Sequence, residues 1–442
     1  MTKRPGLLAR YRRVLKNDAA AGIVLMIAAA AALVWSNSPW REAYERLATT
    51  VVGPGSVHLA LPIEHWASDG ILTVFFFVVG LELKQEFTLG SLRDPRKAAV
   101  PIIAAACGMA GPSAFYALTQ VATGSGEYGG WAVPVATDIA FALAILAIFG
   151  RGLPPAARTF LMTLAVADDL GGIIVIAIFY SGHVAATPLF IALGVLVFLT
   201  VGGRLGIQHA LFFYTGFFVV WYLFTQAGIH PTIAGVLVAF TVPARPKVKL
   251  DSFADNMRDH LASLDFTQAR HAGKSTVLSP GQVLVLTNIH RLAAHTVSPL
   301  QSLVERLNPV VNYLILPLFA FVNAGVHFGG FDLSALAGIP LAIFLGLFVG
   351  KTIGIFTFSY LAAKARIVSI SPEITKRALF GVSILGGIGF TVSLFIANLS
   401  FAAVPDIGDE LLNEAKLGIF VGSLVSGIVG YFFLKHQLPE RD

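Results

Sequence analysis

Residues 157–180 read ARTFLMTLAVADDLGGIIVIAIFY, an apolar stretch with two adjacent aspartates, Asp168 and Asp169, near its middle. The stretch is long enough for a helix that crosses the hydrocarbon core of a bilayer, which takes roughly 20 residues. A charge near the bilayer centre costs roughly 2.5–3.5 kcal/mol on insertion scales, so intramembrane carboxylates usually serve a function. The segment therefore predicts a transmembrane helix that carries a functional pair of acids.

The composition of the whole chain agrees with a membrane protein. Of the 442 residues, 56% are hydrophobic and 13% are charged, whereas a soluble globular chain carries about 25% charged residues. That leaves too little charge to cover a water-facing surface. The single cysteine, Cys107, lies in an apolar run, which excludes an intramolecular disulfide and argues against a cysteine-based metal site.

Apolar stretches of similar length recur along residues 1–442, which we expect to form one membrane domain. The predicted fold class is an all-α integral membrane protein with twelve transmembrane helices. We expect these helices at residues 19–36, 66–83, 98–121, 131–149, 157–180, 185–202, 208–226, 229–243, 309–328, 339–361, 378–399 and 414–434.

The basic residues indicate how these helices are oriented. If the basic N-terminal tail, residues 1–18, is cytoplasmic, the external loops hold only three of the 31 Lys and Arg residues. These three are Arg41, Arg46 and Lys416. Because Lys and Arg are enriched in cytoplasmic loops, we expect both termini in the cytoplasm.

The external loop 38–65 contains a hairpin signal. Val- and Thr-rich residues at 49–52 and an alternating stretch at 57–60 flank a Gly-Pro-Gly turn at 53–55. This pattern predicts a small external β-hairpin.

The long cytoplasmic loop 244–308 is basic, and residues 283–304 within it are amphipathic. An amphipathic segment here could lie on the membrane surface or dock on the helices. The alternative is a mobile loop, since long inserted loops are often flexible.

Three acids and one base lie near the middle of predicted helices: Asp138, Asp168, Asp169 and Lys351. A structural ion pair is one interpretation, but one salt bridge leaves two carboxylates that must be protonated, bind a cation or face water. Side chains of adjacent helical residues diverge by about 100°, so one aspartate can face Lys351 and the other a cavity. Sodium prefers oxygen ligands, and Thr137 offers two. This set fits an ion exchanger.

Two of the predicted helices carry interruptions at their centres. Pro134 disturbs the fourth helix, and the eleventh contains three glycines that weaken it, Gly386, Gly387 and Gly389. Close helix packing is the alternative reason for glycines in a membrane helix. Helices 3–5 and 10–12 run in opposite directions, however, and inverted repeats with broken helices are typical of secondary transporters. Asp138 and Lys351 are then expected to neutralise the opposed helix ends.

Several segments resemble the NhaA family of sodium/proton antiporters. They are DGILTVFFFVVGLELKQE (69–86), PVATDIAFAL (134–143), ADDLGGI (167–173), GIHPTIAG (228–235), YLILPLFAFVNAGV (313–326), GKTIGI (350–355) and GGIGFTVSLFIA (386–397). The resemblance implies an electrogenic, pH-regulated antiporter of a bacterial inner membrane that exports Na⁺, and also Li⁺, in exchange for H⁺. It implies no cofactor.

The same resemblance assigns roles to individual residues. Asp168 and Asp169 would bind the ion, with Lys351 as the charge partner, and Asp138 and Thr137 would stand at the crossing of two unwound helices, four and eleven. Four further residues are implied in the entrance funnel and the pH response: Glu82, Glu86, His230 and Asp69. The hairpin at 49–60 would join two copies into a homodimer.

The loop 244–308 is longer than is usual in this family, and Glu305, Arg306 and Asn308 stand where some relatives place histidines. Two other classes of function remain open. A sodium-coupled symporter of organic anions would show uptake driven by sodium, and a cation channel or pH sensor would pass current without exchange. No HExxH, GxSxG or GxxxxGK[ST] motif occurs, which argues against an intramembrane enzyme and a nucleotide partner. The expected surroundings are membrane lipid, without nucleic acid.

Overall fold

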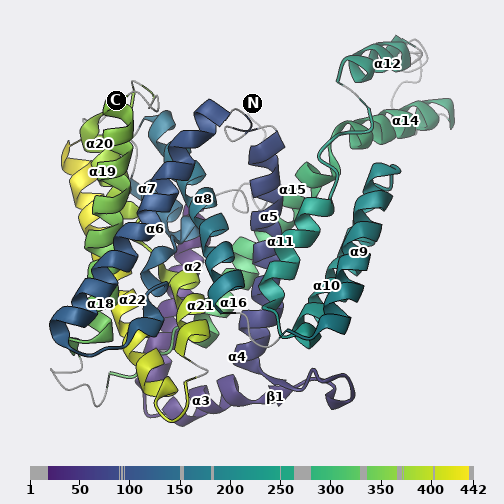
Figure 1. The fold of residues 1–442 in the computed structure, drawn as a ribbon. Coiled ribbons are helices and arrows are strands. Elements are labelled where there is room, and N and C mark those ends of the chain that lie inside the picture. Colours follow the sequence, from purple (N-terminus) through teal and green to yellow (C-terminus); the bar gives the residue numbers. More distant parts are fainter. Residues whose placement is uncertain are drawn as a thin grey trace.

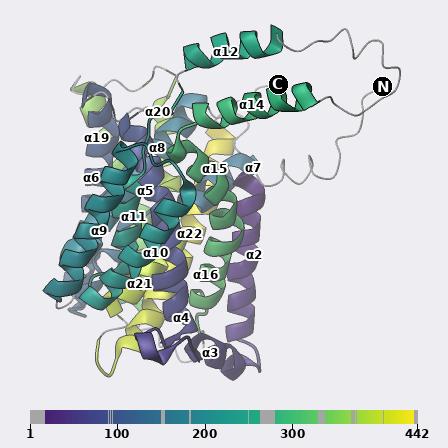
Figure 2. The same cartoon turned by 90° about the vertical axis from the view of Figure 1, so that its right-hand side faces the viewer.

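The computed structural model describes residues 18–88, 90, 93, 95–149, 154–180, 184–248, 250–262, 280–328, 336–365, 371, 373–401 and 404–437. These residues form a bundle of roughly antiparallel helices (Figure 1). The helix α3 and the strand β1 lie at one end of the bundle, and α12 and α14 lie beyond the other end (Figures 1 and 2). We call these the hairpin end and the α14 end.

The elements follow one another along the chain with few strands. In order they are α2 (Asp18–Ser36), α3 (Arg41–Thr49), β1 (Val51–Val52), η1 (Gly55–Val57), β2 (Leu61–Pro62), α4 (Ile63–His65), η2 (Trp66–Ile71), α5 (Leu72–Thr88), α6 (Pro95–Thr123), η4 (Tyr128–Gly130), η5 (Val133–Val135), α7 (Ile139–Phe149), α8 (Pro155–Phe179), α9 (Ala186–Arg204), α10 (Ala210–Ala227), α11 (Pro231–Thr241), α12 (Leu250–Ala262), α14 (Pro280–Thr296), α15 (Pro299–Val310), η6 (Val311–Ile315), α16 (Leu316–Asn323), α18 (Ile339–Leu345), η7 (Gly346–Gly350), α19 (Lys351–Lys364), α20 (Lys376–Leu385), α21 (Phe390–Phe401) and α22 (Gly408–Gln437).

The helices are long and apolar enough for a multi-pass membrane protein. Among the described residues, seven helices could cross a membrane, and nine if each of two bent pairs counts as one span. Each of the twelve ranges predicted from the sequence overlaps at least one helix. Some of these, such as α11 with its 11 residues, are shorter than a full span. The number twelve therefore stays a prediction.

The ninth predicted range begins too late. A helical backbone starts at Pro299 and continues through α15 and η6 into α16, ten residues before the predicted start at 309. The Ser298 side chain accepts a hydrogen bond from the N–H of Gln301, and the Gln301 side chain accepts one from the N–H of Ser298, which forms a capping box. Polar residues such as Arg306 in the first turns hide this helix from a hydropathy search.

The described part of the loop 244–308 contains α12, α14 and most of α15. Leu300 and Leu303 of α15 are buried in a cluster with residues of α5, α9, α10 and α11, so this part docks on the bundle. The helix α14 has no buried residue. Residues 263–279 in this loop and the N-terminal tail up to residue 17 lie outside the described residues.

A two-stranded antiparallel sheet is present at the hairpin end, as the sequence predicted. Val51 pairs with Pro62, and Val52 with Leu61. The second strand was predicted at 57–60 and lies instead at 61–62, because the chain turns for longer than the Gly-Pro-Gly signal implied. A 3₁₀ turn follows Pro54, and His58 adopts a left-handed conformation with φ 58°. The preceding helix α3 was not predicted.

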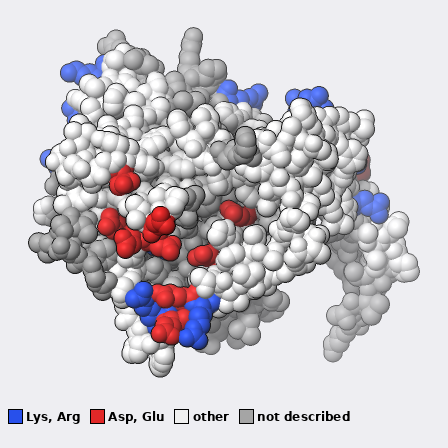
Figure 3. Space-filling model, turned by 60° about the horizontal axis from the view of Figure 1, so that its bottom comes forward, with Lys and Arg blue, Asp and Glu red and all other residues white. Residues whose placement is uncertain are grey.

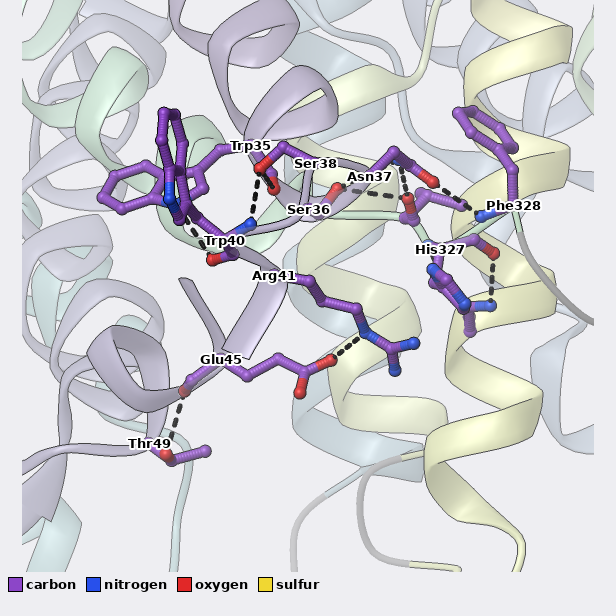
Figure 4. Close-up of polar contacts among 12 residues, drawn as sticks. Trp35, Ser36, Asn37, Ser38, Trp40, Arg41, Glu45, Thr49, His327 and Phe328 are labelled. Carbon is purple, nitrogen blue, oxygen red and sulfur yellow. Dashed lines mark hydrogen bonds and ion pairs between the residues drawn. The ribbon is translucent and has the colours of Figure 1, made fainter. Parts of the chain in front are cut away.

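The corner between α2 and α3 is fixed to the chain that follows α16 (Figure 4). The Asn37 amide donates to the carbonyl of Val326 at 2.7 Å and accepts from the N–H of Phe328 at 3.0 Å. On α3, Arg41 pairs with Glu45 at 2.5 Å. The two bonds of Asn37 hold the hairpin end of α2 against a segment far away in sequence.

Glycines allow the helices around the candidate site to pack very closely. A Cβ added at Gly354 of α19 would lie 2.6 Å from the carbonyl of Cys107, and one at Gly111 of α6 would lie 2.4 Å from the carbonyl of Gly350. Real Cβ atoms do not approach that closely. The small residues bring α19, and with it Lys351, against α6.

Candidate ion-binding site

Two helices are broken near their middles, and the breaks touch. The pair η4–η5 and α7 bends by 41°, and the pair α20 and α21 bends by 46°. In the first break, Ala136 adopts an extended conformation after Pro134. The N–H of Asp138 donates to the carbonyl of Ile388 at 2.6 Å, so the two interrupted chains are joined directly.

Glycines in the second break make this contact possible. A Cβ at Gly387 would lie 2.4 Å from the carbonyl of Leu347, and one at Gly389 would lie 3.0 Å from the carbonyl of Ala136. A side chain at Gly387 would collide with η7, and one at Gly389 would crowd the first break. The glycines thus serve both close packing and the interruption of the helix.

The Asp138 carboxylate, which is 2% exposed, caps two helices at once. Its Oδ1 accepts from the N–H of Phe141 in the first turn of α7 at 3.0 Å. Its Oδ2 accepts from the N–H of Thr391 in the first turn of α21 at 3.0 Å and from the Thr391 hydroxyl at 2.5 Å. Helix N-termini carry unpaired N–H groups and favour negative charge. These contacts favour a capping role over direct binding of a transported ion.

Lys351 lies at the C-terminal end of a short helix, whereas Asp138 lies at N-terminal ends. Its ammonium donates to the carbonyl of Val135, the last residue of η5, where the partial charge is negative. The same ammonium lies 2.7 Å from Oδ2 of Asp168, and both side chains are fully buried. Lys351 directly follows the π-helical turn η7, a type of turn that is frequent at functional sites.

Asp168 and Asp169 on α8 keep most of their oxygens free of protein donors. Oδ2 of Asp168 is within 2.7 Å of the Thr137 hydroxyl, which also lies 2.9 Å from the carbonyl of Gly386. Oδ1 of Asp168 and both carboxylate oxygens of Asp169 have no hydrogen-bond partner within the described structure. Asp168 is fully buried, and Asp169 is 3% exposed. Buried polar atoms nearly always have a hydrogen-bond partner. We therefore expect these three oxygens to bind a proton, a cation or water.

A cavity of about 170 Å³ lies beside the start of α7. Glu82 lines it and accepts a hydrogen bond from the Asn308 amide at 3.0 Å. Ile139 and Ala140, which follow Asp138, also line it, as does Met162 of α8. Two larger cavities, of about 480 and 560 Å³, lie around the turn between α9 and α10. None of the three aspartates lines any of these three cavities, but the Glu82 cavity reaches Ile139, the residue after Asp138. The entrance funnel with Glu82 stays a prediction.

Comparison with known proteins decides the family. A family model described as Na⁺/H⁺ antiporter 1 matches residues 12–434. The chain belongs to this family. A Na⁺/H⁺ antiporter NhaA of Parabacteroides distasonis is 52% identical over 98% of this chain and 97% of its own length. Proteins of the same name from Porphyromonas gingivalis and Koribacter versatilis are 42% and 38% identical, over 95% and 96% of this chain and 93% and 90% of their own lengths. The resemblance found in the sequence is confirmed.

Some residues predicted from the sequence to have a functional role lie far from Asp168 and Asp169. His230 precedes α11 at the hairpin end, and its Nε2 lies 2.6 Å from the carbonyl of Tyr180. Tyr180 is eleven residues beyond Asp169, which is roughly 16 Å along a helix. The Asp69 carboxylate has the titratable side chains of His230 and His65 as neighbours. Asp69 and His230 therefore form a separate group at the hairpin end.

Glu86 lies one helical turn beyond Glu82 on α5 and is half-buried. Two residues that shape the site, Thr391 and Asn308, were not predicted as site residues from the sequence. Thr391 stands just after the glycine break, where a hydroxyl in a first helical turn was a usable signal. Asn308 was noted only as a departure from relatives, and its bond to Glu82 depends on the long-range packing of α15 on α5.

Proposed function

We propose that this chain exports Na⁺ from the cell in exchange for H⁺, with Asp168 and Asp169 as the site that both ions share. The observation that carries the proposal is the state of the two carboxylates. They are adjacent and buried, and three of their four oxygens have no partner among the described residues. Buried carboxylate oxygens of this kind need either protons or a bound cation, and leaving them without both is costly.

The chemistry of the donors suits Na⁺ as the transported substrate. Sodium is a hard cation that prefers oxygen ligands, and the two carboxylates and the Thr137 hydroxyl supply them. The Thr137 hydroxyl lies 2.7 Å from Oδ2 of Asp168, which makes the aspartate pair with Thr137 the proposed cation site. Li⁺ has the same preference, so we propose that it is carried as well.

Competition for one site makes the exchange obligatory. A proton on either aspartate removes the charge that holds Na⁺, and bound Na⁺ excludes the proton. Because two carboxylates can take up two protons where one Na⁺ leaves, the cycle moves net charge and is electrogenic. Lys351 neutralises part of the pair while the site is empty, through its contact of 2.7 Å with Asp168.

Alternating access would move the crossed helices past the rest of the bundle. The two bends of 41° and 46°, and the caps that Asp138 supplies to both α7 and α21, support inverted repeats within a twelve-helix fold. The caps keep the crossing together as a unit while it moves. The Glu82 cavity supports entrance from the α14 end, with Glu86 at its mouth. Asp69 and His230 would set the pH response from the hairpin end.

The proposed orientation in an inner membrane rests on charge. Acidic side chains gather on the hairpin end (Figure 3), where Glu127, Glu410 and Glu414 lie close enough to interact. The helices α12 and α14, which belong to the basic loop 244–308, lie at the other end (Figure 2). Because basic residues are enriched on the cytoplasmic side, we place the termini and the α14 end in the cytoplasm.

The hairpin is proposed as the contact between two copies. Val51 and Val52 of β1 are 60% and 50% exposed, and short strands with open edges readily pair with another chain. Replacing both valines with lysine should convert a dimer in detergent to a monomer, as measured by light scattering. An unchanged mass would remove the hairpin from the interface.

The exchange itself is tested in everted membrane vesicles that respiration has acidified inside. Adding Na⁺ or Li⁺, but not K⁺, should raise the internal pH. Asp168→Asn and Asp169→Asn should each abolish this response, whereas Asp255→Asn, a change at an exposed aspartate of α12, should leave it intact. A full response in both site variants would refute the assignment of the site.

A further inference from the structure

Tyr180, the residue that follows α8, joins four elements at the hairpin end. Its backbone carbonyl lies 2.6 Å from Nε2 of His230. Its hydroxyl donates to the carbonyl of Gly129 at 3.1 Å and lies 3.0 Å from the Ser400 hydroxyl, which donates to it. One side chain and its carbonyl thus connect α8 with η4, α21 and the start of α11.

Three of these elements carry the candidate ion site. The helix α8 bears both aspartates, η4 leads into the break beside Thr137, and α21 bears Thr391. The fourth element, α11, packs tightly on α5. A Cβ at Gly235 of α11 would lie 2.6 Å from the carbonyl of Thr73. Tyr180 therefore links the segments that hold the site to the α5–α11 pair.

The hydrogen bonds of Tyr180 can form at physiological pH. A tyrosine hydroxyl ordinarily loses its proton only near pH 10, so the Tyr180 hydroxyl can donate to Gly129 at physiological pH. An imidazole nitrogen that bonds to a carbonyl oxygen must carry a hydrogen. The contact of His230 with Tyr180 therefore forms with the cationic imidazole and with the neutral tautomer protonated at Nε2.

The link lies on the other side of the aspartates from the Glu82 cavity. Glu82 stands near the α14 end of α5, whereas Tyr180 and His230 lie at the hairpin end. For the site to face the hairpin end, the elements that carry it must part from α11 there, and the contact between Tyr180 and His230 lies directly across that boundary.

We propose that Tyr180 is a positioning residue that holds the hairpin end of the transport path closed while the site faces Glu82. The proposal rests on the exchange function proposed above. The two bonds of the hydroxyl, to Gly129 and Ser400, position the end of α8 and with it the Tyr180 carbonyl that meets His230. Removing the hydroxyl by Tyr180→Phe releases this end of α8 from η4 and α21, which misplaces the carbonyl and weakens the closed state. A smaller population of a binding-competent state lowers its apparent affinity in proportion. The apparent KM for Na⁺ at the Glu82 side should then rise, and that at the hairpin side should fall.

The test compares these KM values in everted and right-side-out vesicles, which present opposite ends of the protein to added Na⁺. For Tyr180→Phe, the ratio of the everted to the right-side-out KM should rise roughly two- to tenfold, as expected for the loss of one or two neutral hydrogen bonds. Ser400→Ala should shift the ratio in the same direction, and Ser400→Thr, which keeps a hydroxyl, should restore it. The control is Tyr128→Phe, at a tyrosine that is 49% exposed.

A ratio that stays at the wild-type value in both Tyr180→Phe and Ser400→Ala would overturn the proposal. The same ratio shift in Tyr128→Phe would also overturn it, because the effect would then not depend on the link. Should Tyr180→Phe fail to fold, as judged by its melting temperature, Ser400→Ala and Ser400→Thr decide the question. Wild-type vesicles without Na⁺-dependent proton movement would instead refute the proposed function, and that outcome is distinct from an unchanged ratio.

Discussion

The Lys351 ammonium lies 2.7 Å from Oδ2 of Asp168 in a place where neither side chain is exposed. The pair leaves Asp169, the next residue, without a base or a donor among the described residues. Two chemically identical acids thus have different surroundings because one faces α19 and the other does not. An exchange site can use this asymmetry, since Lys351 compensates the charge of one carboxylate and its neighbour has no hydrogen-bond partner among the described residues.

The first prediction concerns the cost of breaking this pair. Lys351→Gln leaves Asp168 buried without its partner, and removing one member of a buried ion pair costs about 3–5 kcal/mol. The variant should therefore melt at a clearly lower temperature in detergent. The matched control is Lys364→Gln, at an exposed lysine of the same helix. Equal melting temperatures for the two variants would show that the pair contributes nothing to stability.

The second prediction concerns the double cap. Asp138→Ala removes acceptors from the first turns of both α7 and α21, and loss of one cap costs about 0.5–2 kcal/mol. We expect roughly twice the loss of a single cap in the free energy of unfolding, and slower exchange. Thr391→Ser keeps the hydroxyl and should have little effect. A wild-type unfolding curve for Asp138→Ala would contradict the cap.

The third prediction concerns the crossing of the chains. Gly387→Ala places a Cβ 2.4 Å from the carbonyl of Leu347, and overpacking of this kind costs about 1–3 kcal/mol. Exchange in vesicles should fall sharply. Gly172→Ala is the matched control, because nothing lies within 4 Å of the added atom on α8. If both variants lost activity equally, the close contact of the second break with η7 would not be the cause.

The fourth prediction concerns the Glu82 cavity. Negative charge in a cleft raises the local concentration of cations, so Glu82→Gln should raise the apparent KM for Na⁺ added to everted vesicles several-fold. The maximal rate should change less. Glu410→Gln, on the hairpin end, serves as the control and should leave this KM unchanged. Identical KM values for Glu82→Gln and the wild type would remove Glu82 from the route.

Patterns that depend on local sequence were readable from the chain. Apolar runs predicted where helices lie, and Pro134 and the glycines at 386–389 predicted where two of them break. The rarity of charge in membrane helices singled out Asp138, Asp168, Asp169 and Lys351, all of which the structure buries.

Features that depend on distant partners were not readable. The start of the ninth helix at Pro299 was hidden because its first turns are polar. The second strand shifted from 57–60 to 61–62 because the turn uses a left-handed His58. Spacing alone does not reveal that Thr391 shares a carboxylate with α7, nor that Asn308 reaches Glu82, since both contacts are made between segments more than two hundred residues apart.

The central claim is that H⁺ and Na⁺ compete for the carboxylates of Asp168 and Asp169, and calorimetric titration of the purified protein with Na⁺ tests it most directly. Binding of a cation to a protonated site releases protons and weakens as the pH falls. We predict proton release on Na⁺ addition, and an apparent affinity that drops by roughly tenfold per pH unit for each competing proton once the site is protonated. An affinity that does not change with pH, with no proton released, would contradict the claim.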